Sequence, residues 1–127
     1  MGYKSKQVTT EFLQRFADAW TEHDIDLLMS FMSVAPVFQL SSGPDMDGTR
    51  YTGFKNVKQG FQAMLDKFPD GKWVEASHFV VGDRGVSEWT FTTKGSDGIE
   101  NKVRGCDIFT FEEGKISVKN SFRKIII

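Results

Sequence analysis

The chain has 127 residues, a length typical of one domain, which we expect to span residues 1–127. The 16 Lys and Arg residues against 17 Asp and Glu residues give a formal charge of −1, and this balance argues against nucleic acid as a partner. No apolar stretch approaches the roughly 18 residues that cross a membrane, and the lone cysteine excludes an intramolecular disulfide. Since the start of the chain also lacks the apolar core of a secretory signal, we expect a cytoplasmic protein.

The first third of the chain has the apolar periodicity of helices. Apolar residues at helical spacing over residues 12–20 predict a first helix. Asp24 is a typical N-cap, and the apolar stripe over residues 25–32 predicts a second, short helix after it. A short strand is expected over residues 34–40.

The middle of the chain combines a long loop with a third helix. The segment 41–53 contains Ser-Ser-Gly-Pro-Asp and Asp-Gly, and a loop of this length is often functional. Apolar residues at helical spacing predict a helix over residues 54–68, which ends before Pro69.

The last part of the chain is expected to form an antiparallel meander. Strand-like segments alternate there with short turns that contain glycine. The expected strands cover residues 72–81, 86–94, 99–111 and 115–127. Three helices before such a meander predict an α+β fold, with the helices on one face of a curved sheet.

Four segments of the chain carry a resemblance to known proteins. They are residues 16–26, 53–54, 86–90 and 105–116, of which the last matches best. With the order of elements, they resemble the nuclear-transport-factor-two-like superfamily, and within it the SnoaL-like and ketosteroid-isomerase-like proteins. The resemblance implies a cone-shaped, curved antiparallel sheet with three N-terminal helices over its concave face (a cystatin-like roll) and a small molecule bound in the cone. This fold hosts isomerases, cyclases, hydrolases, lyases and non-enzymatic binders, so the reaction stays open.

The resemblance can be carried over to three positions. Asp107 matches the protonated oxyanion-hole aspartate of ketosteroid isomerases. Phe16 stands where those isomerases have an oxyanion-hole tyrosine, and Gln39 aligns with their general-base aspartate. Because glutamine cannot act as a base near neutral pH, ketosteroid isomerisation by the usual mechanism is not expected.

Asp107 is expected on a strand face among apolar and aromatic residues. Val103, Gly105, Phe109 and Phe111 alternate with it on that face. If this is the concave face, burial disfavours the charged carboxylate unless a cation pairs with it. The alternative is an aspartate at the rim of the sheet, solvated or bonded to a backbone amide.

The turn after this strand decides which residue lies opposite Asp107. A three-residue loop over residues 112–114 places Lys119 there, whereas a two-residue loop places Asn120 there. The two-residue loop requires a positive φ at Glu113, which is unfavourable for glutamate. We therefore expect Lys119 opposite Asp107.

The same register assigns the two faces of the last strand. Ser121 and Arg123 turn inward together with Lys119. The residues expected on the outer face are Ile116, Val118 and Phe122. Because a monomer would expose these apolar side chains, the register implies a homodimer that buries the outer face of the sheet.

The turn before this strand decides where Glu88 lies. A two-residue turn at residues 97–98 pairs Glu88 with Asp107, and we favour it because Asp-Gly is a strong hairpin signal. A three-residue loop would instead turn Trp89 inward. The favoured register brings Glu88, Asp107 and Lys119 together as candidate catalytic residues. The alternative is a buried ion pair with a structural role only.

Aromatic and polar side chains around this cluster are candidates for substrate binding. They are Phe16, Trp20, Gln39, Phe54, Phe61, Trp89, Phe109, Ser121 and Arg123. The face of His78 stays open, because alternation along its strand does not decide it. No spacing of His, Cys and carboxylate residues matches a metal site and no phosphate-binding loop is present, so we expect neither a metal nor another cofactor.

Two hypotheses about function follow. In the first, the protein is an enzyme that acts on a small apolar or aromatic carbonyl compound, as in isomerisation, cyclisation or elimination. Asp107, aided by Lys119 and Glu88, moves a proton at a carbon next to the carbonyl or stabilises the enolate that forms. In the second, the protein is a non-catalytic ligand-binding or dimeric assembly module of the same fold. The absent isomerase base and tyrosine favour the second hypothesis, and the acid–base cluster on an aromatic face favours the first.

Overall fold

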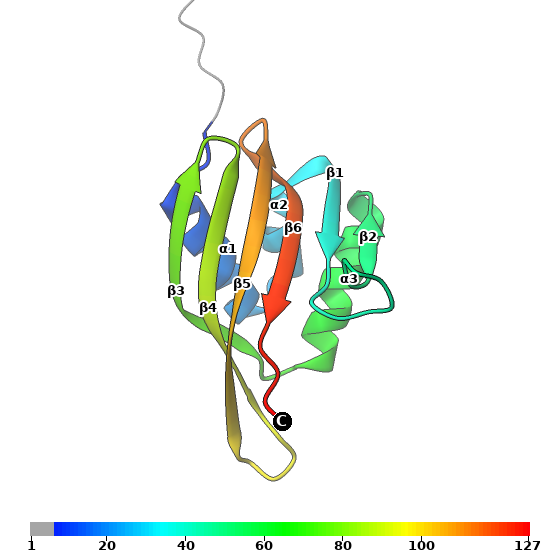
Figure 1. Cartoon of the computed structure of the whole chain (residues 1–127), viewed down its shortest axis with the longest axis vertical. Coiled ribbons are helices and arrows are strands. Elements are labelled where there is room, and N and C mark those ends of the chain that lie inside the picture. Colours follow the sequence, from blue (N-terminus) through cyan, green and yellow to red (C-terminus); the bar gives the residue numbers. More distant parts are fainter. Residues whose placement is uncertain (1–6) are drawn as a thin grey trace, which may run out of the picture.

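The computed structural model describes residues 7–127 (Figure 1). The expected domain and the expectation about the start of the chain include residues 1–6, which lie outside the described part. The helices are α1 (Thr10–Glu22), α2 (Ile25–Ser30) and α3 (Phe54–Lys67). The strands are β1 (Met32–Gln39), β2 (Arg50–Thr52), β3 (Lys72–Val81), β4 (Arg84–Lys94), β5 (Glu100–Glu112) and β6 (Lys115–Arg123). None of the helices between residues 7 and 127 is long and apolar enough to cross a membrane.

The strands form one sheet in the order β2-β1-β6-β5-β4-β3. All neighbouring strands are antiparallel except β1 and β6, so the expectation of a wholly antiparallel sheet is corrected at that junction. The helices lie on one face, with α1 packed against β3 and α3 against β1 and β2 (Figure 1). This arrangement confirms the α+β architecture of a curved sheet covered by helices, although β2 lies in the segment expected to be loop.

Polar side chains begin the first two helices and tie α1 to the sheet. The Thr9 hydroxyl accepts a hydrogen bond from an N–H of the first turn of α1, at 3.1 Å. Asp24 does the same for α2, also at 3.1 Å, which confirms the cap expected there. At the other end of α1, the Thr21 hydroxyl donates to the carbonyl of Trp73 and accepts from its N–H. These bonds fix α1 across the inner face of the sheet.

The hairpin between β5 and β6 has a two-residue turn, so the expected three-residue loop is wrong. Glu113 and Gly114 have φ values of 53° and 74°, as a type I′ turn requires. A bulge at Ser117 then shifts the strand pairing by one residue, so that Lys119 lies opposite Phe109. The bulge cancels the effect of the shorter turn, and Lys119 points inward as expected.

The bulge also changes the faces of the residues around it. Ile116 pairs ahead of the bulge and is fully buried, so its expected outward position is wrong. Val118 is half-buried on the outer face, and Phe122 is 48% exposed there. Ser121 is buried on the inner face and lies opposite Asp107, in the place expected for Lys119.

The hairpin between β4 and β5 also differs from the favoured prediction. Its loop has three residues, 96–98, with Gly98 at a φ of 78°. The alternative register therefore forms, and the favoured two-residue turn is wrong. Glu88 lies opposite Cys106 and is exposed on the outer face, whereas Trp89 is buried on the inner face.

A bulge in β3 places Trp73 and His78 on the same face of the sheet. Strand alternation alone would put two residues five positions apart on opposite faces. The bulge includes Glu75, whose φ of 54° is in the left-handed region. Trp73 consequently pairs with Phe91 and His78 with Ser87, both on the inner face.

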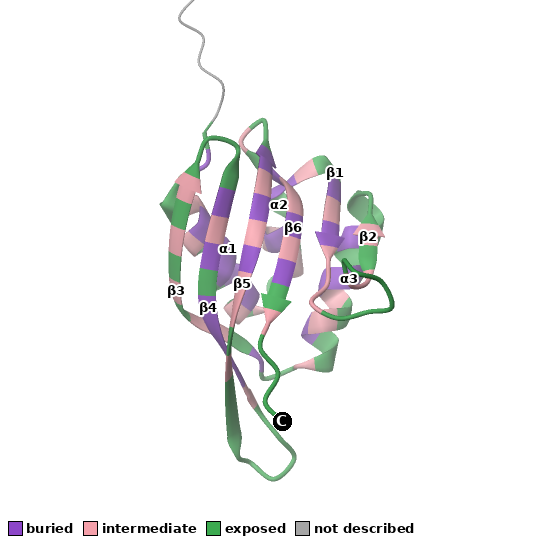
Figure 2. Cartoon of the chain, viewed as in Figure 1, coloured by how far each residue is buried: buried purple, intermediate pink, exposed green. Residues whose placement is uncertain are grey.

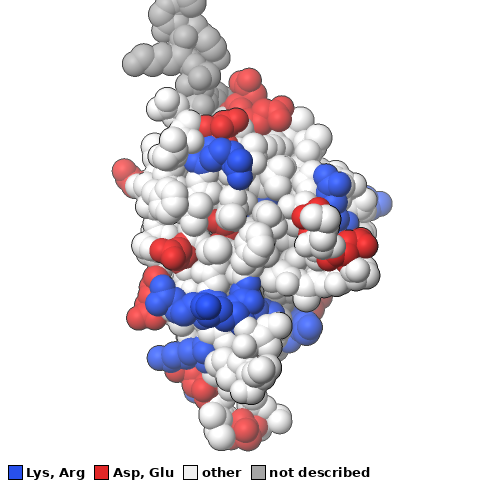
Figure 3. Space-filling model, in the orientation of Figure 1, with Lys and Arg blue, Asp and Glu red and all other residues white. Residues whose placement is uncertain are grey.

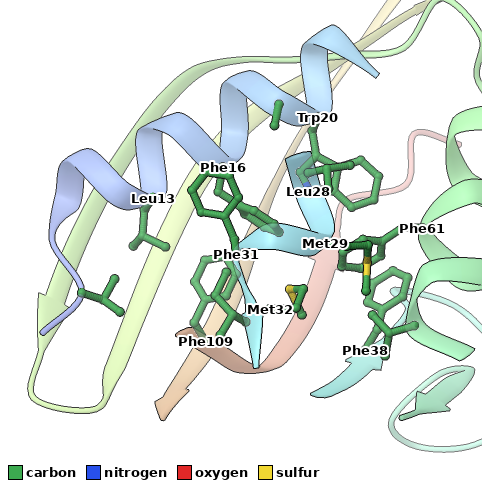
Figure 4. Close-up of a cluster of buried hydrophobic side chains, with 14 of the residues drawn as sticks. Leu13, Phe16, Trp20, Leu28, Met29, Phe31, Met32, Phe38, Phe61 and Phe109 are labelled. Atoms are coloured by element: carbon green, nitrogen blue, oxygen red, sulfur yellow. The ribbon is translucent and has the colours of Figure 1, made fainter. Parts of the chain in front are cut away.

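The core between the helices and the sheet is aromatic. Buried and less buried residues alternate along the central strands (Figure 2). Phe16 of α1 meets the rings of Trp20, Phe31, Phe61 and Phe109 at centroid distances between 5.5 and 6.4 Å (Figure 4). The contacts with Trp20, Phe31 and Phe109 are edge-to-face, an arrangement that adds to the free energy of burial. They build a wall of rings against the middle of the sheet.

Replacing Glu113 by Asn is expected to raise the free energy of unfolding by about 1 kcal/mol, because Asn adopts the left-handed conformation with less strain than Glu. Urea unfolding measures the change. Glu112→Asn is the control, since φ at position 112 is not positive, and it should change the value by less than about 0.5 kcal/mol. A Glu113→Asn variant no more stable than this control would contradict the strain assigned to the turn.

Candidate functional site

A small cavity lies between α1 and the inner face of the sheet. Its volume is about 30 Å³, which is room for one or two water molecules. The apolar and aromatic lining residues are Leu13, Phe16, Ala17, Trp20, Phe38, Leu40, Met64, Trp73, Trp89 and Phe109. The polar ones are Ser41, Ser87, Asp107, Lys119, Ser121 and Arg123. A ligand larger than water therefore requires side chains around the cavity to move.

Asp107 of β5 is the polar centre of this cavity. Its Oδ1 accepts hydrogen bonds from Lys119 Nζ at 3.0 Å and from the Ser121 hydroxyl at 2.6 Å. Its Oδ2 accepts a hydrogen bond from the Trp89 indole N–H at 2.9 Å. The carboxylate is only 5% exposed, so these three donors replace the water that it would otherwise bind.

Lys119 of β6 is buried beside this carboxylate and covered by aromatic rings. Its Nζ lies 4.8 Å from the ring centroid of Phe38, 5.0 Å from that of Trp20 and 5.9 Å from that of Phe61. It also donates to the Ser121 hydroxyl at 2.8 Å. The faces of aromatic rings attract a cation, and the attraction is larger where water is excluded. The ammonium is thus held by one charge, one hydroxyl and three rings.

Four predicted site residues do not line the cavity. Glu88 is exposed on the outer face, because the register differs from the favoured one. Gln39 follows the inward-facing Phe38, and strand alternation turns it to the outer face. Phe54 is 43% exposed at the start of α3, and Phe61 is fully buried in the aromatic core. None of these four contributes to the wall of the cavity.

The remaining predicted site residues do line the cavity. They are Phe16, Trp20, Trp89, Asp107, Phe109, Lys119, Ser121 and Arg123. They come from α1, β4, β5 and β6, and the register of the two hairpins brings them together.

Trp20 brings an unpaired donor to this site. Its indole N–H is buried and has no hydrogen-bond partner among residues 7–127. A buried N–H group without an acceptor is unfavourable unless water or a ligand accepts its hydrogen bond. Trp20 lies one helical turn beyond Phe16, the position at which the resemblance implies an oxyanion-hole tyrosine. α1 therefore carries a hydrogen-bond donor one turn away from the position of the absent tyrosine.

Arg123 stands at the edge of the cavity, at the end of β6. Its guanidinium lies 4.9 Å from the ring centroid of Phe91 and 5.4 Å from that of Phe68. Burial lowers the pKa of Arg123 from its usual value, although a guanidinium stays charged near neutral pH. In the described part of the chain, no carboxylate forms a salt bridge with it. The cavity edge thus carries a cation without a counter-ion.

His78 and Ser87 form a polar contact that the sequence interpretation missed. Nδ1 of His78 lies 2.7 Å from the Ser87 hydroxyl, and Nε2 lies 2.8 Å from Oε1 of Gln14 on α1. Burial lowers the pKa of His78, and the nearby Asp18 carboxylate partly offsets the effect. The signal in the sequence was Gly82-Asp83. Glycine at the first position of a two-residue turn is typical of a type II′ hairpin, and a turn at residues 82–83 pairs His78 with Ser87.

Cys106 lies on the outer face, opposite Glu88. Burial raises the pKa of its thiol, and the carboxylates of Asp107 and Glu88 raise it further. The thiol is therefore protonated near neutral pH and is a weak nucleophile.

Residues 7–127 contain no group of three or more His, Cys, Asp or Glu side chains that could hold a metal ion. The polar groups of the cavity wall are one carboxylate, two cationic side chains, serine hydroxyls and indole N–H groups.

Comparison with known proteins identifies the family. The family model described as "SnoaL-like domain" matches residues 13–118. The chain belongs to the SnoaL-like family. Among curated protein sequences, none matches this chain at a significant level.

Solved structures share the fold. A nuclear-transport-factor-two-like protein of unknown function from Mesorhizobium loti is 27% identical, with a TM-score of 0.73 over 91% of this chain and 89% of that one. A candidate polyketide cyclase from Xanthomonas campestris is 18% identical, with a TM-score of 0.75 over 89% and 87%. TerC, co-crystallised with polyporic acid, is 17% identical, with a TM-score of 0.73 over 90% and 89%. These likenesses agree with the expected superfamily and its cystatin-like roll.

The stability of the Asp107–Lys119 pair can be tested by removing its charges. Lys119→Met and Asp107→Asn are each expected to lower the free energy of unfolding by about 3–5 kcal/mol, because each leaves a buried charge without its partner. The double variant should recover most of this loss, since it buries no unpaired charge. Urea unfolding measures all three changes.

The control for this experiment is the exposed ion pair between Lys58 and Asp26, whose side chains are 48% and 87% exposed. Lys58→Met should cost at most about 1 kcal/mol. If Lys119→Met costs no more than Lys58→Met, the ammonium of Lys119 is not buried against the carboxylate.

Proposed function

We propose that the inner cavity of this SnoaL-like protein binds a small apolar or aromatic carbonyl compound, and that Asp107 acts on it as a general base. The observation that carries the proposal is a buried carboxylate that faces the cavity and accepts from Lys119, Ser121 and Trp89. Aromatic walls favour an apolar ligand, and the polar groups of β5 and β6 give it an orientation. The neighbour that was crystallised with polyporic acid supports the binding of a small organic molecule in this fold.

Asp107 is proposed to take a proton from a carbon next to the carbonyl group. All three protein partners donate hydrogen bonds to its oxygens, so the carboxylate is an acceptor in this geometry. This differs from the donor role that the resemblance implies for a protonated aspartate at this position. An acceptor at the cavity wall is suited to proton abstraction, as in isomerisation, cyclisation or elimination.

The negative charge that develops on the carbonyl oxygen needs donors in the same cavity. Lys119 has three N–H groups, of which Asp107 and Ser121 use two. The indole N–H of Trp20 is unpaired. The guanidinium of Arg123 supplies a further positive charge at the edge. Together these groups can stabilise an enolate oxygen without a cofactor.

A non-catalytic binding module is the second candidate function. The cavity of about 30 Å³ is far below the roughly 300–1,000 Å³ of common small-molecule sites. If the cavity does not widen, it holds water only, and the pair of Asp107 with Lys119 serves to join β5 and β6.

Deuterium exchange separates the two candidates without knowledge of the natural substrate. The probe is 2-tetralone in D2O, a small aromatic ketone whose α-hydrogens exchange with solvent through the enolate. We expect the protein to accelerate the exchange, as followed by NMR, and Asp107→Asn to reduce the acceleration at least about 100-fold. Glu88→Gln is the matched control, because this exposed carboxylate faces away from the cavity and should leave the rate unchanged.

The outcomes assign the function as follows. Binding of 2-tetralone to the cavity residues without accelerated exchange would make the protein a binder rather than a catalyst. An acceleration that survives in Asp107→Asn would remove Asp107 from the role of base. Absence of both binding and exchange would reject the cavity as a site for aromatic ketones.

We further propose that the outer face of the sheet joins two copies of the chain. Phe79 and Phe122 are 56% and 48% exposed on this face. The centre of the face is largely uncharged, and a band of Lys and Arg crosses its lower end (Figure 3). A two-fold contact brings such a face against itself. Glu88 and Arg104 line the same hollow of this face, so the face offers both signs of charge to a second copy.

Sedimentation of the purified protein tests this contact. The wild type is expected to be a dimer, and Phe122→Glu to be a folded monomer, because the new charge would be buried in the contact. Phe54→Glu changes an equally exposed phenylalanine on α3 and should stay dimeric. A monomeric wild type would contradict the proposed dimer.

A further inference from the structure

A row of polar side chains crosses the inner face of the sheet. Strand pairing puts His78 of β3 opposite Ser87 of β4, Ser87 opposite Asp107 of β5, and Asp107 opposite Ser121 of β6. Directly paired residues have Cβ atoms about 5 Å apart. Asp107 and Ser121 belong to the site described above. Ser87 also lines this cavity, but neither Ser87 nor His78 has a role in the proposed function.

A chain of hydrogen bonds fixes the proton positions in the outer half of this row. The Gln14 amide nitrogen lies 2.9 Å from the Asp18 carboxylate and donates to it. The amide oxygen of Gln14 is then the atom that faces Nε2 of His78, at 2.8 Å, so Nε2 carries the hydrogen. Nδ1 is left with its lone pair and accepts from the Ser87 hydroxyl at 2.7 Å. The Asp18 carboxylate thereby selects the histidine tautomer that can take a proton from Ser87.

The surroundings keep this imidazole neutral and able to accept a proton. Burial lowers the pKa of His78, so the ring is mostly uncharged at neutral pH. The charged group that faces it is Asp18 of α1, which favours the imidazolium once it forms. On the β4 side the ring meets the neutral Ser87, which is only 3% exposed. Ser87 supplies a hydroxyl, His78 a base and Gln14 a group that orients the base. This combination is typical of sites that transfer protons.

We infer that Ser87 and His78 form a second proton-transfer site in the cavity, distinct from Asp107. A ligand hydroxyl donates its proton to the Ser87 oxygen while the Ser87 proton moves to Nδ1 of His78. The ligand becomes an oxyanion, His78 becomes an imidazolium and Ser87 ends as the neutral hydroxyl it was at the start. The reverse transfer returns the proton to the ligand, so no other reactant is needed.

This inference rests on the proposed function and narrows its substrate class. Asp107 takes a proton from a carbon atom of the ligand. The Ser87–His78 pair, on the neighbouring strands, takes a proton from an oxygen atom of the ligand. The two sites on one wall fit a compound that carries a hydroxyl group as well as a carbonyl group, such as a phenolic or enolic ketone.

The first test determines the tautomer of His78 in the ligand-free protein. Long-range proton–nitrogen NMR of the imidazole rings resolves the two histidines, and His23→Gln identifies their signals. We expect a protonated Nε2 and an unprotonated Nδ1 in His78 at neutral pH. Gln14→Leu removes the orienting amide and should give a mixture of tautomers. A wild-type His78 protonated at Nδ1 would overturn the inference, because it could not accept the Ser87 proton.

The second test follows the transfer itself with p-nitrophenol, whose ionised form is coloured. At a pH where the free phenol is mostly neutral, we expect the protein to increase the bound phenolate at least tenfold. The His78 ring should become doubly protonated in the same sample. Ser87→Ala should abolish both changes, whereas Glu88→Gln, which alters an exposed carboxylate on the outer face, should leave both in place. A structural serine would not link the colour of the probe to the charge of His78.

The outcomes distinguish failure of this inference from failure of the proposed function. Phenolate formation that survives in Ser87→Ala, or that leaves His78 neutral, would overturn the second site and leave Asp107 as the candidate base. Absence of p-nitrophenol from the cavity, judged from the NMR signals of its lining residues, would tell against the aromatic ligand of the proposed function. In that case the tautomer measurement alone decides the inference.

Discussion

A carboxylate buried on the inner face of the sheet requires donors, and Asp107 determines much of what surrounds it. The ammonium of Lys119, the hydroxyl of Ser121 and the indole N–H of Trp89 reach it from the strands on either side. Lys119 in turn needs an environment that tolerates a dehydrated cation, and the aromatic rings between the sheet and the helices supply it. The polar centre and the aromatic core therefore depend on each other, since losing either would leave a buried group uncompensated.

Two bulges make this polar row compatible with an apolar core. The bulge in β6 keeps Ile116 in the core and still turns Lys119 inward. The bulge in β3 turns both Trp73 and His78 to the inner face, where Trp73 joins the aromatic core and His78 the polar row. An uninterrupted strand would place one member of each pair on the outer face. The inner face of the sheet thus receives both apolar and hydrogen-bonding side chains from the same strands, and bulges near functional sites often act in this way.

The sequence was sufficient to predict the helices and most strands, because periodicity and turn residues are local signals. Alternation placed Asp107 on the same face as Phe109 and Phe111, but it did not decide whether that face is the inner one. The sequence did not determine the register. The positive φ of Glu113 is contrary to residue preference, and no residue type marks the bulge that compensates for it. Glu88 was misplaced because Asp-Gly also fits the longer loop that forms. The parallel pairing of β1 with β6 joins distant segments, and local patterns carry no information about it.

That parallel pairing also orders the assembly of the molecule. Val37 of β1 pairs with Val118 of β6, about 80 positions later, whereas the hairpins from β3 to β6 join neighbouring segments. Closing the larger loop costs more chain entropy, so we expect the hairpins to form before β1 joins β6. Phe38 of β1 pairs with Lys119 of β6, so its ring reaches the ammonium only when this closure is complete. We therefore expect the cation to lose its remaining water only when the Asp107 carboxylate of the neighbouring strand is already beside it.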